Sequence, residues 1–344
     1  MVKIYSIDSL REAKKTQTID TVIPFKLNGK EYLAPKKIVN GEMETYVLTK
    51  PIGEMLRSNS LAQYKDLLKK VVLDVELGRE QVPLLYSPIY DLLSDPTMPK
   101  LIDAKWALTG TVVFTEHMEG EEVKFGALQV EYGPTARLLT YTAGFEYTKE
   151  MKDFNDNFSV DILNRSMGEA YNALLNHIYL SPIINYTYKT ANKTPYQGSA
   201  DEDVWVRYYK TLTQAIIDCN KAKRPGTILL ASSMNKDNIE MAIKGGYQIN
   251  GTTYPAVSGI SSIIYYDGWS TQVGRKSYSY PGVADGKCYL IRPKRGFKEL
   301  LKQDLQIESQ AGDLSRLVEQ QIVGYAYRGC YAAIDENVQE ITLG

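Results

Sequence analysis

The chain has 344 residues, of which 44% are hydrophobic and 24% are charged, a composition typical of folded globular proteins rather than disordered ones. Its formal net charge of -1 excludes the large basic surplus that drives nucleic-acid or membrane binding by counter-ion release. The three cysteines are dispersed and odd in number, which favours a reducing compartment over a disulfide framework.

No membrane or export segment is expected from the sequence. The opening residues lack the apolar core of a signal peptide, and no run of about 20 apolar residues could span a bilayer. The abundant aromatic residue is tyrosine, with 26 Tyr against 7 Phe. Because tyrosine joins an apolar face to a polar end, this excess is interpreted as a surface that becomes an interface.

Residues 1–55 are expected to form an extended arm rather than a domain. The apolar pieces VIPFKL, EYLAP and TYVL are short, and Asn-Gly pairs at 28–29 and 40–41 separate them as turns. One short helix is expected over LREAKK, after the capping-box spacing of Ser9 and Glu12. The arm has too few apolar residues to close a core, so we expect it to lie on another surface.

An amphipathic helix is predicted to begin after Ser60 and to end at Gly78. The next segment, residues 78–104, contains four prolines. It is expected to cross a surface with at most one short helix, IYDLLSD.

Residues 111–133, TVVFTEHMEGEEVKFGALQVEYG, are predicted to form a long β-hairpin with Gly120 at its tip. Its crest is almost wholly charged and holds Glu116, Glu119, Glu121 and Glu122. A two-stranded ribbon is marginally stable in water, so its apolar residues require a partner surface. These residues are Val113, Val123, Phe125, Leu128 and Val130.

A strand is predicted over ARLLTYTAGFEY, residues 136–147, and a long helix over residues 159–180. Apolar residues recur in this helix at steps of three and four, which predicts a buried stripe. The stripe after Val160 consists of Leu163, Met167, Ala170, Leu174 and Ile178.

Another helix is predicted within residues 201–226, with acids at its start, bases at its end and Pro225-Gly226 after it. Its expected buried side is Val204, Tyr208, Leu212, Ile216 and Cys219. Short strands then alternate with one helix: TILLAS, NKDNIEMAIKGG (the helix), SGISSIIYY and KCYLIRP. The last residues, from about 317 onward, are expected to be β-rich.

Residues 267–287 are rich in glycine and poor in aliphatic side chains, so a surface loop is expected there. The residues that define this expected loop are Asp267, Gly268, Gly274, Gly282 and Gly286. The run from Gly282 to Cys288 is one residue short of a phosphate-binding P-loop and ends in Cys, so it is interpreted as a polar turn.

Catalytic, cofactor and metal sites are not expected. The two histidines, His117 and His177, have no Cys or His at ligand spacing, and no Gly-x-Ser-x-Gly or Gly-x-Gly-x-x-Gly motif occurs. The acidic crest lacks the Asp/Asn pattern of a calcium loop. The sequence therefore favours a structural assembly subunit over an enzyme.

The order of these parts resembles the major capsid protein of tailed bacteriophages. Residues 133–180, GPTARLLTYTAGFEYTKEMKDFNDNFSVDILNRSMGEAYNALLNHIYL, resemble that family's passage from an extended loop into a spine helix. Residues 323–341, VGYAYRGCYAAIDENVQEI, are similar to its final strands. The resemblance implies an α+β Hong Kong 97-type fold, a structural role and no enzyme activity.

The resemblance also implies a division of the chain. Residues 1–103 would be the N-terminal arm and connecting helix, 104–135 the extended loop, and 136–199 the peripheral domain with the spine helix. Residues 200–313 would be the axial domain, with 267–287 as a candidate axial loop, and 314–344 the return strands of the peripheral domain.

By the same resemblance, the chain would assemble with copies of itself as hexamers and pentamers of an icosahedral shell in the bacterial cytoplasm. The shell, part of the virion, would enclose double-stranded DNA without sequence-specific binding and without a membrane. A portal and a decoration protein are further implied partners. No long charged helix precedes the extended loop, so a separate scaffolding protein is expected. Lys124 and Asn337 are a poorly supported pair for the cross-link known in some relatives, and non-covalent contacts are favoured.

Two alternatives remain open from the sequence. An encapsulin-like compartment would share the fold but enclose an enzyme cargo. A small-molecule-binding α/β enzyme would be a discrete monomer with a deep polar pocket, and it would leave the hairpin unexplained.

Overall fold

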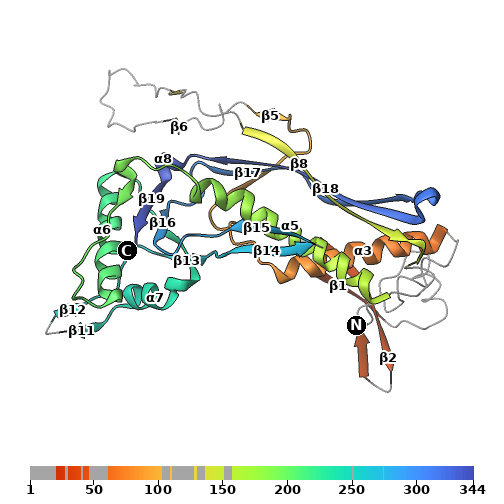
Figure 1. The fold of residues 1–344 in the computed structure, drawn as a ribbon, viewed down its shortest axis with the longest axis horizontal. Coiled ribbons are helices and arrows are strands. Elements are labelled where there is room, and N and C mark those ends of the chain that lie inside the picture. Colours follow the sequence, from red (N-terminus) through yellow and green to blue (C-terminus); the bar gives the residue numbers. More distant parts are fainter. Residues whose placement is uncertain are drawn as a thin grey trace, which may run out of the picture. The chain divides into compact units, whose positions relative to one another are not determined.

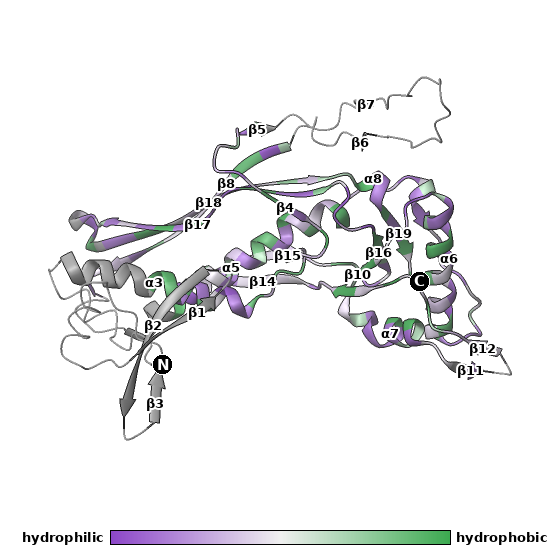
Figure 2. Cartoon of the chain, turned by 180° about the vertical axis from the view of Figure 1, so that it is seen from behind, coloured by the Kyte–Doolittle hydropathy of each residue, from purple (hydrophilic) through white to green (hydrophobic). Residues whose placement is uncertain are grey.

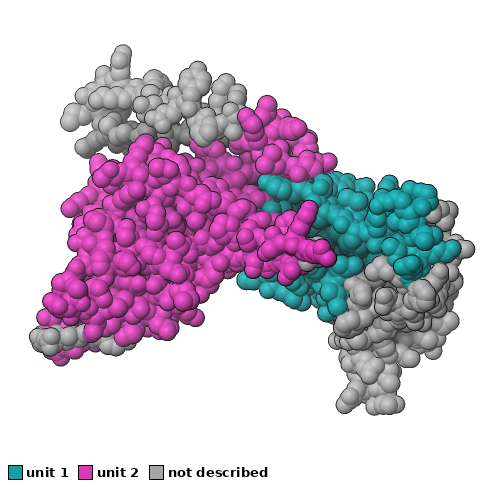
Figure 3. Space-filling view, in the orientation of Figure 1, with its two compact units in different colours: residues 1–84, 141–176, 305–326 teal, residues 85–140, 177–304, 327–344 magenta. Residues whose placement is uncertain are grey.

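The computed structural model describes residues 21–27, 30–39, 42–45, 61–102, 109–110, 128–129, 136–150, 157–249, 252–273 and 275–344 (Figure 1). The chain forms two compact units (Figure 3). Unit 1 holds residues 1–84, 141–176 and 305–326, and unit 2 holds residues 85–140, 177–304 and 327–344. Each unit is therefore built from three separate stretches of the chain.

The expected extended pieces near the N-terminus form a three-stranded antiparallel sheet. Its strands are β1 (Thr21–Leu27), β2 (Lys30–Val39) and β3 (Glu42–Thr45). The strands break at the two Asn-Gly pairs, and the register joins Leu27 with Lys30 and Val39 with Glu42. Strands β1 and β2 contain the expected pieces VIPFKL and EYLAP, so these two predictions are confirmed. Strand β3 shares only Thr45 with the expected piece TYVL, whose other residues lie outside the described residues, as does the helix expected over residues 10–15.

The first long helix, α3 (Leu61–Gln81), continues past Gly78, so the prediction that this glycine ends it is wrong. The segment after α3 also differs from expectation. The expected short helix is instead strand β4 (Asp91–Ser94), which pairs in parallel with β17. Tyr86, Ile89, Tyr90 and Met98 are buried, so the proline-rich segment contributes to the core of unit 2 instead of crossing a surface.

A five-stranded sheet has the order β4-β17-β18-β8-β5. Its long members are β8 (Ala136–Thr148), β17 (Phe297–Ala311) and β18 (Val318–Ala332), and β5 (Leu101–Ile102) lies at one edge. The 3-10 turn Leu314–Arg316 connects β17 with β18. The strand predicted over residues 136–147 is confirmed.

The predicted long helix is α5 (Asn157–Ile184), which begins two residues before and ends four residues after the expected range. Pro182 lies in its last turn. No helix among the described residues is long and apolar enough to cross a membrane.

The second five-stranded sheet lies in unit 2 and has the order β13-β10-β16-β19-β9. Its strands are β9 (Lys193–Thr194, after the 3-10 turn Thr190–Asn192), β10 (Ile228–Ala231), β13 (Ser262–Tyr265), β16 (Lys287–Ile291) and β19 (Val338–Thr342). Figure 2 shows hydrophobic residues along β10 and β19. All four residues of β10 are buried, as expected for an internal strand.

Helices α6 (Val204–Lys221) and α7 (Lys236–Lys244) belong to the same region, and the 3-10 turn Ser233–Asn235 precedes α7. Their apolar residues form one core with the sheet: Leu212, Ala215 and Cys219 of α6 pack with Leu229, Leu290 and Ile341. The predictions of α6, α7, β10, β13 and β16 are confirmed. Val204 was expected on the buried side of α6, but its side chain is 40% exposed.

Two small antiparallel hairpins also belong to unit 2. Strands β11 (Tyr247–Ile249) and β12 (Thr252–Tyr254) form the first. Strands β14 (Gly268–Val273) and β15 (Lys276–Pro281) form the second, named here the β14–β15 ribbon. The expectation of an irregular loop at residues 267–287 is therefore wrong. Serine, threonine and aromatic residues alternate well enough there to pair as strands despite the glycines.

The end of the chain also differs from the expected division. Strand β18 belongs to the long sheet, but after α8 (Ile334–Asn337) strand β19 pairs with β16 and β9 in the second sheet. Residues 338–342 thus belong with the segment assigned to the axial domain. Conversely, β17, assigned to that domain, lies in the long sheet.

Candidate functional site

In unit 1, helices α3 and α5 touch through their backbones at two glycines. A Cβ atom on Gly78 would lie 2.0 Å from the carbonyl oxygen of Arg165, and one on Gly168 would lie 1.9 Å from that of Val75. Both distances are far below van der Waals contact, so only glycine fits at either position. Gly78 therefore serves close packing of the helices and not helix termination.

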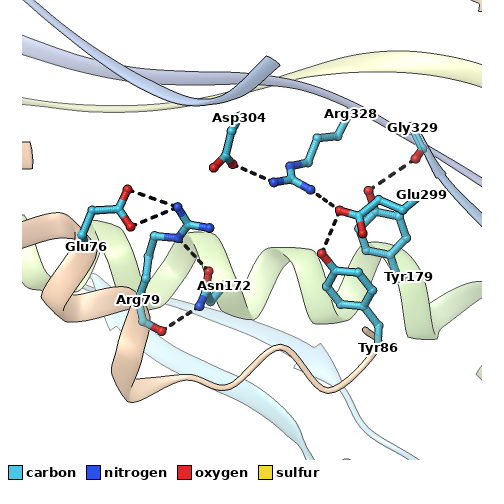
Figure 4. A network of polar contacts seen from close by, with 9 residues as sticks. All are labelled: Glu76, Arg79, Tyr86, Asn172, Tyr179, Glu299, Asp304, Arg328 and Gly329. Atoms are coloured by element: carbon cyan, nitrogen blue, oxygen red, sulfur yellow. Dashed lines mark hydrogen bonds and ion pairs between the residues drawn. The ribbon is translucent and has the colours of Figure 1, made fainter. Parts of the chain in front are cut away.

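The end of α3 is held by two asparagine side chains of α5, of which Figure 4 shows Asn172. The amide of Asn172 donates to the carbonyl oxygens of Arg79 at 2.7 Å and Val82 at 2.8 Å. The amide of Asn176 donates to the carbonyl of Pro83 at 2.8 Å. The last carbonyls of a helix and those that follow it have no partner within the helix, so these amides supply hydrogen bonds at the point where α3 ends.

Charged groups in the same contact are paired. The Arg79 guanidinium lies 3.2 Å from a carboxylate oxygen of Glu76 and donates to Oδ1 of Asn172 at 3.1 Å. About two turns earlier on α5, Asn164 accepts from the Tyr147 hydroxyl at 3.2 Å and donates to Asp74 at 3.3 Å. The buried polar groups of unit 1 thus form directional contacts that fix the register of α3 on α5.

This contact corrects the predicted stripe of α5. Met167 is buried as expected, but Leu163 is 38% exposed, and Ala170, Leu174 and Ile178 are half-buried. The buried line instead follows Asn164, Gly168, Asn172, Leu175, Asn176 and Tyr179. It is rotated by about one residue, because asparagine and glycine do not count as apolar although they carry the closest contacts. The four-residue spacing of Asn164, Gly168, Asn172 and Asn176 was the signal available in the sequence.

Unit 2 contains a second polar cluster, also drawn in Figure 4. The buried Arg328 guanidinium pairs with Glu299 and, at 2.6 Å, with Asp304. The Tyr86 hydroxyl donates to Glu299 at 2.9 Å. An isolated buried charge is very costly, and here each charge has a partner.

Aromatic rings surround that cluster. Tyr179 stacks on Tyr86 with 4.2 Å between ring centroids and lies 5.1 Å from Tyr90, whose hydroxyl donates to the Tyr179 carbonyl at 2.7 Å. Tyrosines buried among the described residues are Tyr86, Tyr90, Tyr147, Tyr171, Tyr179, Tyr188, Tyr208, Tyr266 and Tyr289. These nine of the 26 tyrosines belong to the interior of the subunit, so they do not contribute to an interface surface.

The β14–β15 ribbon is anchored at its base. Tyr280 stacks between Trp269, at 5.6 Å, and His177 of α5, at 4.6 Å. A Cβ atom on Gly268, whose φ is +87°, would lie 2.2 Å from the Tyr280 carbonyl, and one on Gly282 would lie 2.2 Å from the carbonyl carbon of Asp267. Two of the expected loop glycines thus allow the strands to leave the sheet side by side.

The remaining residues that define the expected loop are Asp267, Gly274 and Gly286. Hydrogen bonds from Ser232 and Ser233 hold the pKa of Asp267 below its usual value, although burial acts to raise it. A Cβ atom on Gly286 would meet open space, and Gly274 lies outside the described residues.

The imidazole of His177 on α5, which stacks on Tyr280, is partly buried. This burial lowers the pKa of His177.

The expected hairpin falls mostly outside the described residues. Val113, Val123, Phe125 and Val130 lie there, and only the backbone of Leu128 is described. Strand β6 (Thr109–Gly110) pairs antiparallel with β7 (Leu128–Gln129) and joins Gly110 with Leu128. The described residues on the two sides of the expected hairpin are thus paired as antiparallel strands.

The described residues offer little reactive chemistry. They include no group of three or more His, Cys, Asp or Glu that could hold a metal ion. The thiols of Cys219, Cys288 and Cys330 are free. Burial raises the pKa of Cys330 to about 12, so its thiolate is scarce at neutral pH.

Comparison with solved structures identifies the architecture. A virus-like particle from Pyrococcus furiosus matches with a TM-score of 0.50 and 9% identity, over 79% of this chain and 97% of that one. The capsid of cyanophage P-SCSP1u matches with a TM-score of 0.51 and 10% identity, over 76% and 88%. The chain has the Hong Kong 97-type capsid fold. An encapsulin complex from Synechococcus elongatus also matches, with a TM-score of 0.47, 9% identity and coverage of 77% and 89%.

Only the comparison of structures finds similar proteins. No protein-family model matches the chain, and no curated protein matches its sequence. The similarity confirms the expected fold class. At about one identical residue in ten, it assigns no individual residue a role.

Proposed function

We propose that this chain is a shell-forming structural protein, and specifically the major capsid protein of a tailed bacteriophage. The observation that carries the proposal is the Hong Kong 97-type fold, shared with a phage capsid over 76% of the chain. A structural role also agrees with interiors devoted to packing: the polar clusters of both units consist of paired groups. No catalytic or cofactor-binding residue is proposed.

In this proposal, residues 104–135 form the extended loop, α5 is the spine helix, and the long sheet with α5 forms the peripheral domain. The second sheet with α6 and α7 forms the axial domain, to which β19 is now added. The β14–β15 ribbon is no longer proposed as an axial loop, because its base stacks on the spine helix.

The extended loop is proposed to clasp a neighbouring copy of the chain. Burying several hundred Å² of its apolar face would contribute several kcal/mol at about 25 cal/mol per Å², before the costs of association. A closed shell repeats the contact at every subunit, so modest pairwise strength is sufficient. The acidic crest would keep free subunits soluble and discourage premature edge pairing.

The decisive experiment is purification followed by electron microscopy and sedimentation. Wild-type protein, with its scaffolding protein co-expressed if required, should form megadalton particles. Replacing residues 116–124 with a short Gly-Ser turn, and separately combining Phe125→Ser with Leu128→Ser, should leave folded subunits that do not assemble. Normal particles from both variants would disprove the clasp. A discrete wild-type monomer under every condition would instead favour the α/β enzyme alternative.

Cargo distinguishes a phage head from an encapsulin-like compartment. Particles from the native source should contain nuclease-protected DNA and co-purify with a portal. A co-purifying enzyme in place of DNA would favour the compartment. Chelators and reductants should leave particle size unchanged, since shell contacts are proposed to need neither metal nor disulfide.

A further inference from the structure

The β14–β15 ribbon has two unlike faces. Cross-strand pairing places Trp269 opposite Tyr280 and Thr271 opposite Tyr278, on one face. The other face pairs Ser270 with Ser279 and Gln272 with Ser277, whose side chains are polar, beyond the pair of Gly268 and Pro281 at the base. The aromatic pair nearest the base is covered through the stack on His177, whereas Tyr278, farther out, is 50% exposed.

The outer half of the ribbon lacks a partner strand among the described residues, since its sheet contains only β14 and β15. A lone two-stranded ribbon is marginal in water. Six residues in each strand carry the tip about 20 Å from the anchored base. The close backbone contacts at Gly268 and Gly282 fix the direction in which the ribbon leaves the base. A ribbon held in this way can present its tip to another molecule.

The charge of the tip indicates the chemistry of that molecule. Arg275 and Lys276 are exposed, and neither forms an ion pair with a described residue. Residues 268–281 contain no acid. The acids that flank this segment in the sequence, Asp267 and Asp285, accept hydrogen bonds at the base from Ser233 N at 2.7 Å and from Ser232 Oγ at 2.7 Å. The tip is therefore a small, uncompensated basic site.

The complementary charge occurs in the chain itself. Residues 106–123 contain Glu116, Glu119, Glu121 and Glu122 and no lysine or arginine. This is the acidic segment proposed above to reach a neighbouring subunit. We propose that the basic tip of the β14–β15 ribbon receives the acidic residues 116–122 of a second copy of the chain. The proposal rests on the proposed shell function and names the partner surface of its clasp.

Charge exchange tests the pairing directly. The double variant Arg275→Glu/Lys276→Glu should fold with the wild-type circular dichroism spectrum. It should need at least about tenfold more protein to assemble, because attraction becomes repulsion at every copy of the contact. Adding Glu119→Lys, Glu121→Lys and Glu122→Lys to the same chain should restore assembly. The matched control Arg275→Lys/Lys276→Arg keeps both charges and should assemble like the wild type.

Salt provides a second readout. Raising the ionic strength from about 0.05 to 0.5 M should weaken wild-type assembly and lessen the defect of the reversed variant, because both effects are screened. If the reversed variant assembles at the same protein concentration as the wild type, the pairing is overturned. It is also overturned if the chain with all five substitutions does not regain assembly. Normal shells that no longer retain DNA would overturn it in favour of a nucleic-acid contact. Absence of wild-type particles would refute the shell function itself.

Discussion

Helices α5 and α6 are buried by different means. Along α6, Leu212, Ala215 and Cys219 face an apolar sheet, so its position depends on buried area. Along its unit 1 half, α5 meets α3 through Gly168 and asparagines that bind named carbonyl groups. Apolar area is non-directional, whereas backbone contact and hydrogen bonds are directional. The first kind of packing tolerates substitution, and the second fixes one register.

The largest expected effect comes from placing a charge on the buried line of α5. Leu175 is fully buried, so Leu175→Asp should prevent folding, because an unpaired buried carboxylate costs roughly 5 kcal/mol or more. Leu163→Asp, at a position 38% exposed, should give soluble protein with little change in melting temperature. If Leu163→Asp prevented folding and Leu175→Asp did not, the buried side of α5 would be the one expected from apolar periodicity.

The next effect comes from the glycine contact. Alanine ordinarily stabilises a helix by about 1 kcal/mol relative to glycine, but Gly168→Ala should destabilise unit 1 by about 3 kcal/mol. The reason is the 1.9 Å approach of its Cβ to the Val75 carbonyl oxygen. Denaturant unfolding would measure the difference. Gly286→Ala, where the added carbon meets open space, is the control and should change little.

A smaller loss is expected from the asparagines. Asn172→Leu keeps a similar volume but removes the donors to the Arg79 and Val82 carbonyls and the acceptor for Arg79 Nε. Losing these three hydrogen bonds in a buried contact should cost about 2 kcal/mol or more. The exposed Asn185 gives the control variant Asn185→Leu, which should unfold at the wild-type denaturant concentration. Equal midpoints for both variants would show that the carbonyls find water instead.

The smallest effect is expected in α6. Leu212→Met conserves volume in an apolar core and should cost about 1 kcal/mol or less, measured by the same denaturant titration. Leu212 is 1% exposed, so this tolerance would not reflect exposure. A loss as large as that of Asn172→Leu would remove the distinction between the two helices.

The same distinction explains what the sequence could predict. Hydrophobic periodicity and helix-capping residues located α5, α6, α7 and the strands β10, β13 and β16, because those elements bury apolar residues at regular spacing. The Asn-Gly pairs located the breaks between β1, β2 and β3. These predictions depend only on neighbours along the chain.

The misplaced features depend on distant segments. The sequence around Gly78 predicts a helix end, because it does not show that the backbone of α5 lies beside this glycine. Residues 91–94 are predicted as part of a helix, because the sequence does not show that β17 lies beside them and pairs with them. The glycines of residues 267–287 resemble a loop unless the strands at Gly268 and Gly282 must pass closely. Local propensity cannot report contacts between residues so far apart in sequence.

The position of β19 has a consequence for biosynthesis. In the second sheet it lies between β16 and β9, and it is the last of the five strands to leave the ribosome. Until residues 338–342 emerge, β16 lacks one neighbour and β9 has no strand to pair with. A nascent chain therefore cannot complete this sheet during most of its translation. Until then the edge of β16 that pairs with β19 is unpaired, and unpaired strand edges promote aggregation, so this sheet depends on the last residues of the chain for its protection.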